Sequence, residues 1–88
     1  MIDYDKICRD AVQRYGIQSQ IGQANEEMGE LISAINRLRR GRCTTDDVIT
    51  EIADVAITTY QLALIFGVDK VHAEIERKLE RLEKRMAK

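Results

Sequence analysis

The sequence predicts an all-α chain of four helices that forms a single domain over residues 1–88. No proline interrupts the chain, and no segment alternates apolar and polar residues as a half-buried strand would. Apolar residues instead recur three and four positions apart, which places them along one face of a helix. Gly16, Gly41 and Gly67 separate these periodic segments, and glycine often ends a helix because it tolerates the left-handed conformation.

The first predicted helix covers residues 3–15, with an apolar stripe that runs from Ile7 to Tyr15. The second covers residues 18–40 and ends in several arginines, which suit the negative end of the helix dipole. Its apolar positions form a seam of coiled-coil type. They are Ile21, Ala24, Met28, Leu31, Ile35 and Leu38.

The third predicted helix begins at Thr44 or Thr45, because Thr44 and Asp47 have the spacing of a capping box. It runs to Phe66 and is apolar on most faces, which is typical of a central helix. The fourth helix is expected to start with Asp69 as its N-cap and to reach residue 84 or beyond. Its apolar stripe consists of Val71, Ile75, Leu79, Leu82 and Met86.

Composition narrows the class of protein. Apolar residues make up 44% of the chain and charged residues 33%, as in a globular protein, and the net charge of −1 gives no general attraction for nucleic acid. The N-terminus is polar and acidic, the apolar stretch 55–68 is too short to cross a bilayer, and the two cysteines are isolated. We therefore expect a cytoplasmic protein with no membrane association. A small helical chain with one very apolar helix also predicts a homo-oligomer, either a dimer or a tetramer.

Two matched acidic pairs are the most informative feature. Glu27 and Glu30 lie three positions apart on the second helix, and Glu51 and Asp54 lie three apart on the third. Residues at this spacing share a helix face, so each pair presents two carboxylates together. Antiparallel packing of the two helices would bring all four carboxylates into one cluster.

Such a cluster requires a counterion. At ~4 Å and an effective dielectric constant of ~20, each pair of like charges costs about 4 kcal/mol. No charged residue occurs between Val55 and Val68, so Glu51 and Asp54 belong to an otherwise apolar helix. Carboxylate oxygens are the preferred ligands of Mg²⁺. The pattern therefore predicts that all four carboxylates bind a hard divalent cation.

The two pairs in this order resemble the acidic motif of the MazG-like family, which belongs to the all-α nucleoside triphosphate pyrophosphatase superfamily. The residues that carry the resemblance are Glu26-Glu27-x-x-Glu30 and, some twenty positions later, Glu51-x-x-Asp54. The match spans roughly half of the chain. It implies an oligomeric helical bundle and a Mg²⁺-dependent enzyme, with Mn²⁺ as a possible substitute, that hydrolyses nucleoside triphosphates to nucleoside monophosphates and pyrophosphate.

The resemblance also implies roles for individual residues. Glu27, Glu30, Glu51 and Asp54 would be the metal ligands, and Glu26 would be a base for the attacking water or a support for the ligands. A basic side chain on the fourth helix would contact phosphate, and Lys78 and Arg81 are the candidates. Asn25 and Gln23 are further candidates, for contact with the base or ribose.

Two relatives within the superfamily are alternatives. A phosphoribosyl-ATP pyrophosphohydrolase typically carries a Tyr-His pair soon after the second acidic pair, whereas the corresponding stretch here, residues 57–61, contains no histidine. A dUTP-specific enzyme is the other, because the chain gives no sign of which base it prefers.

Two further alternatives belong to other functional classes. One is a helical oligomer without catalytic activity, which would require the acidic pairs to be solvated. The other is a nucleic-acid-binding module that uses the arginine cluster at 37–42. Nucleic-acid binding is disfavoured because this cluster lies at the end of a helix, where the dipole already favours positive charge, and because no exposed aromatic residue accompanies it.

Overall fold

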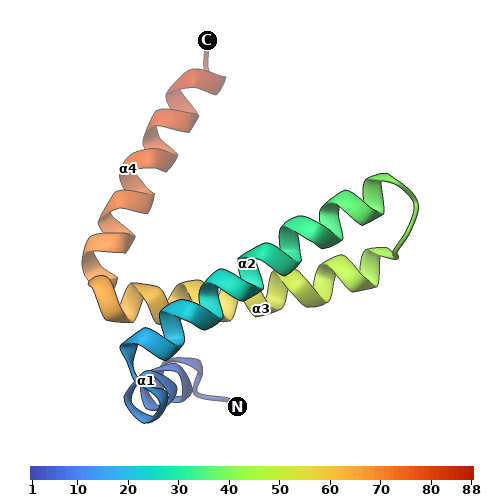
Figure 1. Ribbon diagram of the computed structural model, residues 1–88. Helices are drawn as coiled ribbons and strands as arrows, with labels where there is room; N and C mark the ends of the chain where they lie inside the picture. The colour runs from blue at the N-terminus through green and yellow to red at the C-terminus, as the bar shows by residue number, and fades with distance from the viewer.

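The computed structural model describes all 88 residues, and its regular structure consists of four helices (Figure 1). They are α1 (Tyr4–Tyr15), α2 (Ile17–Arg39), α3 (Thr45–Phe66) and α4 (Val68–Met86). The predicted all-α class and the four helices are confirmed, and the predicted ends differ from these bounds by one or two residues.

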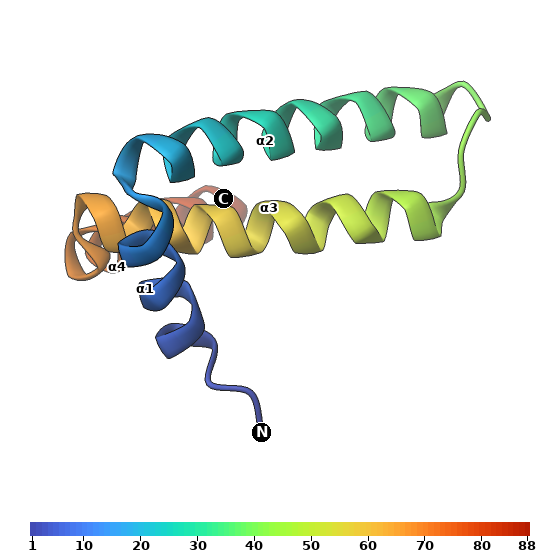
Figure 2. The same cartoon turned by 60° about the horizontal axis from the view of Figure 1, so that its bottom comes forward.

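Helices α2 and α3 form a long antiparallel pair at the centre of the molecule; they run side by side in Figure 2, and α2 passes in front of α3 in Figure 1. Ala24 and Ala34 of α2 are 1% and 0% exposed, so small side chains occupy the closest part of the contact. Most of the predicted seam on α2 is at least partly buried. Ile35 is the exception: it is 42% exposed, and Ala34 takes the inward position instead.

The turn between α2 and α3 is fixed by local hydrogen bonds. Gly41 has a φ of 69°, its N–H donates to Leu38 O at 2.9 Å, and the next N–H, that of Arg42, donates to Arg37 O at 2.8 Å. This pair of bonds is a Schellman motif, which requires a left-handed residue at the position of the glycine. At the start of α3, Thr44 and Asp47 form the predicted capping box.

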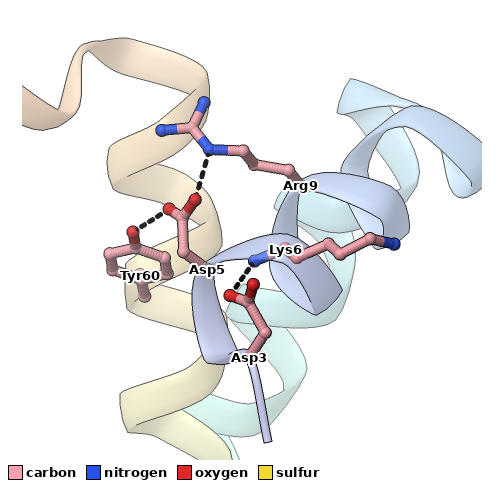
Figure 3. A network of polar contacts seen from close by, with 5 residues as sticks. All are labelled: Asp3, Asp5, Lys6, Arg9 and Tyr60. Carbon is pink, nitrogen blue, oxygen red and sulfur yellow. Dashed lines mark hydrogen bonds and ion pairs between the residues drawn. The ribbon is translucent and has the colours of Figure 1, made fainter.

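Helix α1 packs across the α2–α3 pair and is attached mainly to α3. The Tyr60 hydroxyl donates to the Asp5 carboxylate, which also accepts from Arg9 Nε at 2.8 Å (Figure 3). The rings of Tyr4 and Tyr60 meet edge to face, with centroids 5.3 Å apart. Cys8 is buried behind this contact as a free thiol.

Helix α4 turns away from the other three helices, as Figure 1 shows. It begins directly after Gly67, which has a φ of 121°, and no side chain caps its N-terminus. The prediction that Asp69 is the N-cap was wrong: the helix starts one residue earlier, so Asp69 lies inside the first turn. Every residue of α4 after Val71 is exposed, so the predicted apolar stripe of this helix is left mostly uncovered by the chain beyond Val71.

The single chain is more open than a compact domain. It exposes 7023 Å², whereas a compact monomer of 10.1 kDa exposes about 5300 Å². Its radius of gyration is 15.6 Å, compared with about 12 Å for a compact chain of this length. Only 7 of 88 residues are buried. The globular compactness that composition predicted is therefore not reached by one chain alone.

Helix α3 was predicted to be a central helix, but one of its faces is exposed to solvent. The apolar stretch 55–68 belongs mostly to this helix, whose 22 residues are long and apolar enough to cross a membrane by length and composition alone. Core helices of soluble proteins meet the same criterion. The face of α3 that does not contact α2 exposes large apolar side chains, among them Ile49, Ile52 and Phe66.

Candidate metal centre and adjoining cavity

Three carboxylates meet between the central helices. Glu51 and Asp54 project from one face of α3, Glu27 faces them from α2, and one oxygen from each lies within 4.8 Å of the others. All three residues are half-buried. The meeting follows from the antiparallel packing of α2 and α3, which places the middle of one helix beside the first turns of the other.

Two oxygens in this cluster have no partner. Glu27 Oε2 and Glu51 Oε2 have almost no contact with solvent and accept no hydrogen bond. The other oxygen of Glu27 accepts from Gln23 Nε2 at 2.7 Å. The ion pairs of the structure lie elsewhere, at Lys6–Asp10, Arg9–Asp5 and Arg77–Glu74. The cluster thus concentrates negative charge without a basic residue to compensate it, which is costly for oxygens removed from water.

The pKa of Glu27 reflects this lack of compensating positive charge. Loss of solvation raises the pKa of Glu27, and the charges of Glu30 and Asp54 raise it further, while the hydrogen bond from Gln23 lowers it. Three converging carboxylates, two of which carry an unpartnered oxygen, are a donor set that fits a hard divalent cation such as Mg²⁺ or Mn²⁺. The residues present therefore fit the predicted type of metal.

The structure brings three of the four predicted ligands together. Glu30 is exposed and lies outside the group of three, although its carboxyl group is close enough to that of Glu27 to raise the pKa of Glu27 by its charge and by hydrogen bonding. The reason is geometric: residues three apart on a helix differ in direction by about 60°, and α2 turns Glu27, rather than Glu30, toward α3.

The other predicted site residues lie outside the cluster. Glu26 and Asn25 are exposed on α2. Lys78 and Arg81 are exposed on α4, where they border a shallow hollow of about 200 Å³. Because α4 packs only against α3 and then turns away, one chain does not place these two basic side chains beside the carboxylates.

A cavity of about 410 Å³ adjoins the carboxylates between α1, α2 and α3. Its lining is Ala11, Tyr15, Ser19, Gln20, Gln23, Glu27, Asp54, Ile57, Thr58 and Gln61. Gln20, Thr58 and Gln61 are buried polar residues that sequence reasoning did not select. A signal was present for Gln20, since it lies seven residues before Glu27 and so on the same side of α2.

Comparisons of this chain with protein-family models, with curated proteins and with solved structures found no match. What the protein does must therefore be inferred from the carboxylates, the cavity beside them and the acidic motif.

Proposed function

We propose that the protein is a Mg²⁺-dependent pyrophosphohydrolase that converts nucleoside triphosphates or their deoxy forms to nucleoside monophosphates and pyrophosphate. One observation carries the proposal: Glu27, Glu51 and Asp54 converge with two unpartnered oxygens and no basic residue among them. The acidic motif, which resembles that of the MazG-like family, supports the choice of reaction. A role in clearing unwanted nucleotides from the cytoplasm belongs to the same proposal.

The carboxylate cluster favours a substrate that arrives with its own cation. A bare triphosphate is repelled by three carboxylates, whereas a Mg²⁺ complex is attracted to them. When bound, Mg²⁺ neutralises charge that develops on the phosphates and acidifies coordinated water. Glu27, Glu51 and Asp54 would hold it, and Glu30, one turn further along α2, could join them by rotating its side chain.

The proposed reaction balances as a simple hydrolysis. The oxygen of a water molecule attacks the α-phosphorus, the bond from the α-phosphorus to the α–β bridging oxygen breaks, and pyrophosphate leaves with the electron pair. A carboxylate accepts the proton that the water releases. Glu26, adjacent to Glu27 and open to solvent, is our candidate for this base.

The proposed enzyme acts as a homo-oligomer, a dimer or a tetramer. One chain exposes about 1700 Å² more than a compact monomer would, and a standard interface covers about 800 Å² on each partner. A second copy would cover the apolar stripe of α4. Lys78 and Arg81 of that second copy would also reach the phosphates of a substrate bound to the first chain.

The test is an assay of pyrophosphate release from the eight common ribo- and deoxyribonucleoside triphosphates, with and without Mg²⁺. We expect release from at least one of them, only when Mg²⁺ is present, in equal amount to the nucleoside monophosphate. Release of orthophosphate in place of pyrophosphate would point to another bond, and no release from any of the eight would overturn the proposed activity.

A further inference from the structure

The cavity beside the carboxylates has two chemically different ends. On α2, Gln20 precedes Glu27 by seven residues, and on α3, Gln61 follows Asp54 by seven residues. Because the helices are antiparallel, the two glutamines lie at one end of the cavity and the two acids at the other. Seven residues span about 10 Å along a helix, so the cavity has an amide end and an anionic end about that far apart.

The two amides at the first end lack strong partners. Gln20 and Gln61 are 7% and 8% exposed. The Gln20 side chain makes no hydrogen bond within the protein, and the Gln61 amide lies beside the thiol of Cys8, whose sulfur is a weak acceptor. Although both residues are mostly buried, neither amide belongs to the polar atoms that are shut off from solvent without a partner, so the amides open onto the cavity. A ligand that displaces water from them without pairing with them would lose about 1–3 kcal/mol for each amide. Two such amides that line one cavity point to a ligand that pairs with both.

The remaining polar groups of the lining are partly used. Gln23 donates its N–H to Glu27, which leaves its carbonyl oxygen free to accept. The Thr58 hydroxyl donates to the backbone oxygens of Asp54 and Val55, which leaves its own lone pairs free. Between the carboxylates and the glutamines the lining carries no charge. A ligand that matches this lining is uncharged at the amide end and carries both hydrogen-bond donors and acceptors.

We infer that this cavity binds the nucleobase of the substrate, with Gln20 and Gln61 reading the edge of the base. The inference rests on the proposed function, because it places the phosphates of the same molecule at the carboxylates. The span of about 10 Å between the two ends is comparable to the distance from the outer edge of a nucleobase to its 5′-phosphate.

The chemistry of a nucleobase suits this lining in two respects. Each base carries a donor and an acceptor side by side on its edge, and a carboxamide can pair with both at once. The ring is planar and needs apolar walls, which Ala11 and Ile57 supply. Tyr15 also lines the cavity, and 61% of this residue is exposed. Because unpaired buried amides penalise a ligand that lacks these groups, the glutamines would determine which base is accepted.

The first test observes the glutamine side chains directly in ¹H–¹⁵N spectra of the metal-free protein. Adenosine, guanosine, cytidine and uridine are added separately at millimolar concentration. We expect at least one nucleoside to shift the side-chain NH₂ signals of Gln20 and Gln61. Gln20→Met and Gln61→Met should each weaken its binding roughly tenfold. Gln18→Met, an exposed position on α2, should leave binding unchanged.

Absence of any shift with all four nucleosides would overturn the inference, and so would unchanged affinity in both methionine variants. If a variant does not fold, contacts between nucleoside protons and the glutamine NH₂ groups are sought in the wild-type protein by intermolecular nuclear Overhauser effects. Their presence supports the inference, and binding without such contacts refutes it.

Assays of the same variants separate this inference from the proposed function. If pyrophosphate release continues and neither Gln20→Met nor Gln61→Met raises the KM for any nucleoside triphosphate, the proposed activity is supported and the proposed base site is wrong. If no triphosphate is hydrolysed but nucleosides still bind at the glutamines, the proposed base site is supported and the proposed reaction is wrong.

Discussion

Glu51 carries an oxygen that has almost no contact with solvent and accepts no hydrogen bond. Asp54, one turn later on α3, faces the same cluster and also lines the cavity. Both side chains sit where an anion is unfavourable unless a cation binds there. We therefore regard them as the positions at which a neutral amide of the same size would be most informative.

Glu51→Gln and Asp54→Asn should each lower kcat/KM for pyrophosphate release more than about hundredfold, because loss of groups that only support a metal ligand already costs 10–100-fold. Steady-state kinetics with saturating Mg²⁺ checks this, and circular dichroism should show unchanged helix content. Asp46→Asn is the control, since Asp46 is an exposed acid in the first turn of the same helix. Full activity in either site variant would show that the substituted residue is not a metal ligand.

Glu27 allows a test that requires no turnover. Burial raises its pKa above the ordinary value of 4.5, with further contributions from Glu30 and Asp54. The folded state therefore holds the proton more tightly than the unfolded state, and the free energy of unfolding falls as pH rises from 4.5 through the raised pKa. Without metal, ionised Glu27 destabilises the fold.

Glu27→Gln should thus raise the melting temperature of the metal-free protein at pH 7, and the difference from wild type should vanish near pH 4. Saturation with Mg²⁺ at 100 times its Kd should stabilise the wild type by about 2.7 kcal/mol, and the variant by less. Differential scanning calorimetry with EDTA or with Mg²⁺ measures both effects. A variant that melts below the wild type in EDTA at pH 7 would contradict this account.

At the scale of the elements, helix ends were predictable from sequence because they depend on neighbouring residues alone. The capping box of Thr44 and Asp47 and the glycine at position 41 are local signals, and both act as expected. Asp69 was misleading because aspartate suits either the N-cap or the first turn of a helix. The capping box also lowers the pKa of Asp47, through the backbone N–H and then the hydroxyl of Thr44.

Thr44→Ala should lower the free energy of unfolding by about 1 kcal/mol. Because the pKa of Asp47 is lowered in the folded state, its contribution is present above the ordinary value of 3.8 and is lost as pH falls below it. The effect of the substitution should therefore shrink toward pH 3. Urea denaturation at fixed chain concentration measures it. Thr45→Ala, which removes a hydroxyl that makes no hydrogen bond, should change stability by only a few tenths of that amount.

Pairing between elements was only partly predictable. The apolar period on α2 correctly indicated an inward face, but it did not specify the rotation of the helix about its axis. That rotation buries Ala34 instead of Ile35 and turns Glu27, rather than Glu30, toward Glu51. The same rotation brings Gln20 into the cavity, because Gln20 lies seven residues before Glu27 and so on the same side of α2.

At the scale of the whole molecule, helix α4 presents an apolar stripe that the rest of the chain does not cover. Ile75, Leu79 and Leu82 are all more than 40% exposed. Burial of apolar surface is the main favourable term in association, at about 25 cal/mol per Å². A second copy of the chain is the partner that we propose for this stripe.

Replacement of both Leu79 and Leu82 by glutamate should convert the oligomer to a chain of 10.1 kDa in light scattering. Two charges in an apolar interface are too costly to bury. Lys84→Glu, which introduces the same side chain on the charged side of α4, should leave the mass of the oligomer unchanged. If the double variant remains oligomeric, the interface does not involve this stripe. If the wild-type protein is monomeric, the proposed oligomer is wrong.

The sequence by itself determined that the chain is helical, where three of its helices begin and end to within a residue, and which acidic pairs share a helix face. These properties follow from the 3.6-residue period and from capping, both of which act within a few residues. The tertiary structure decided that Glu27 joins Glu51 and Asp54 without Glu30, and that two distant glutamines line one cavity. These contacts depend on how the two helices are rotated about their axes relative to each other. The small side chains at the closest contact determine that rotation, and no local pattern in the sequence specifies it.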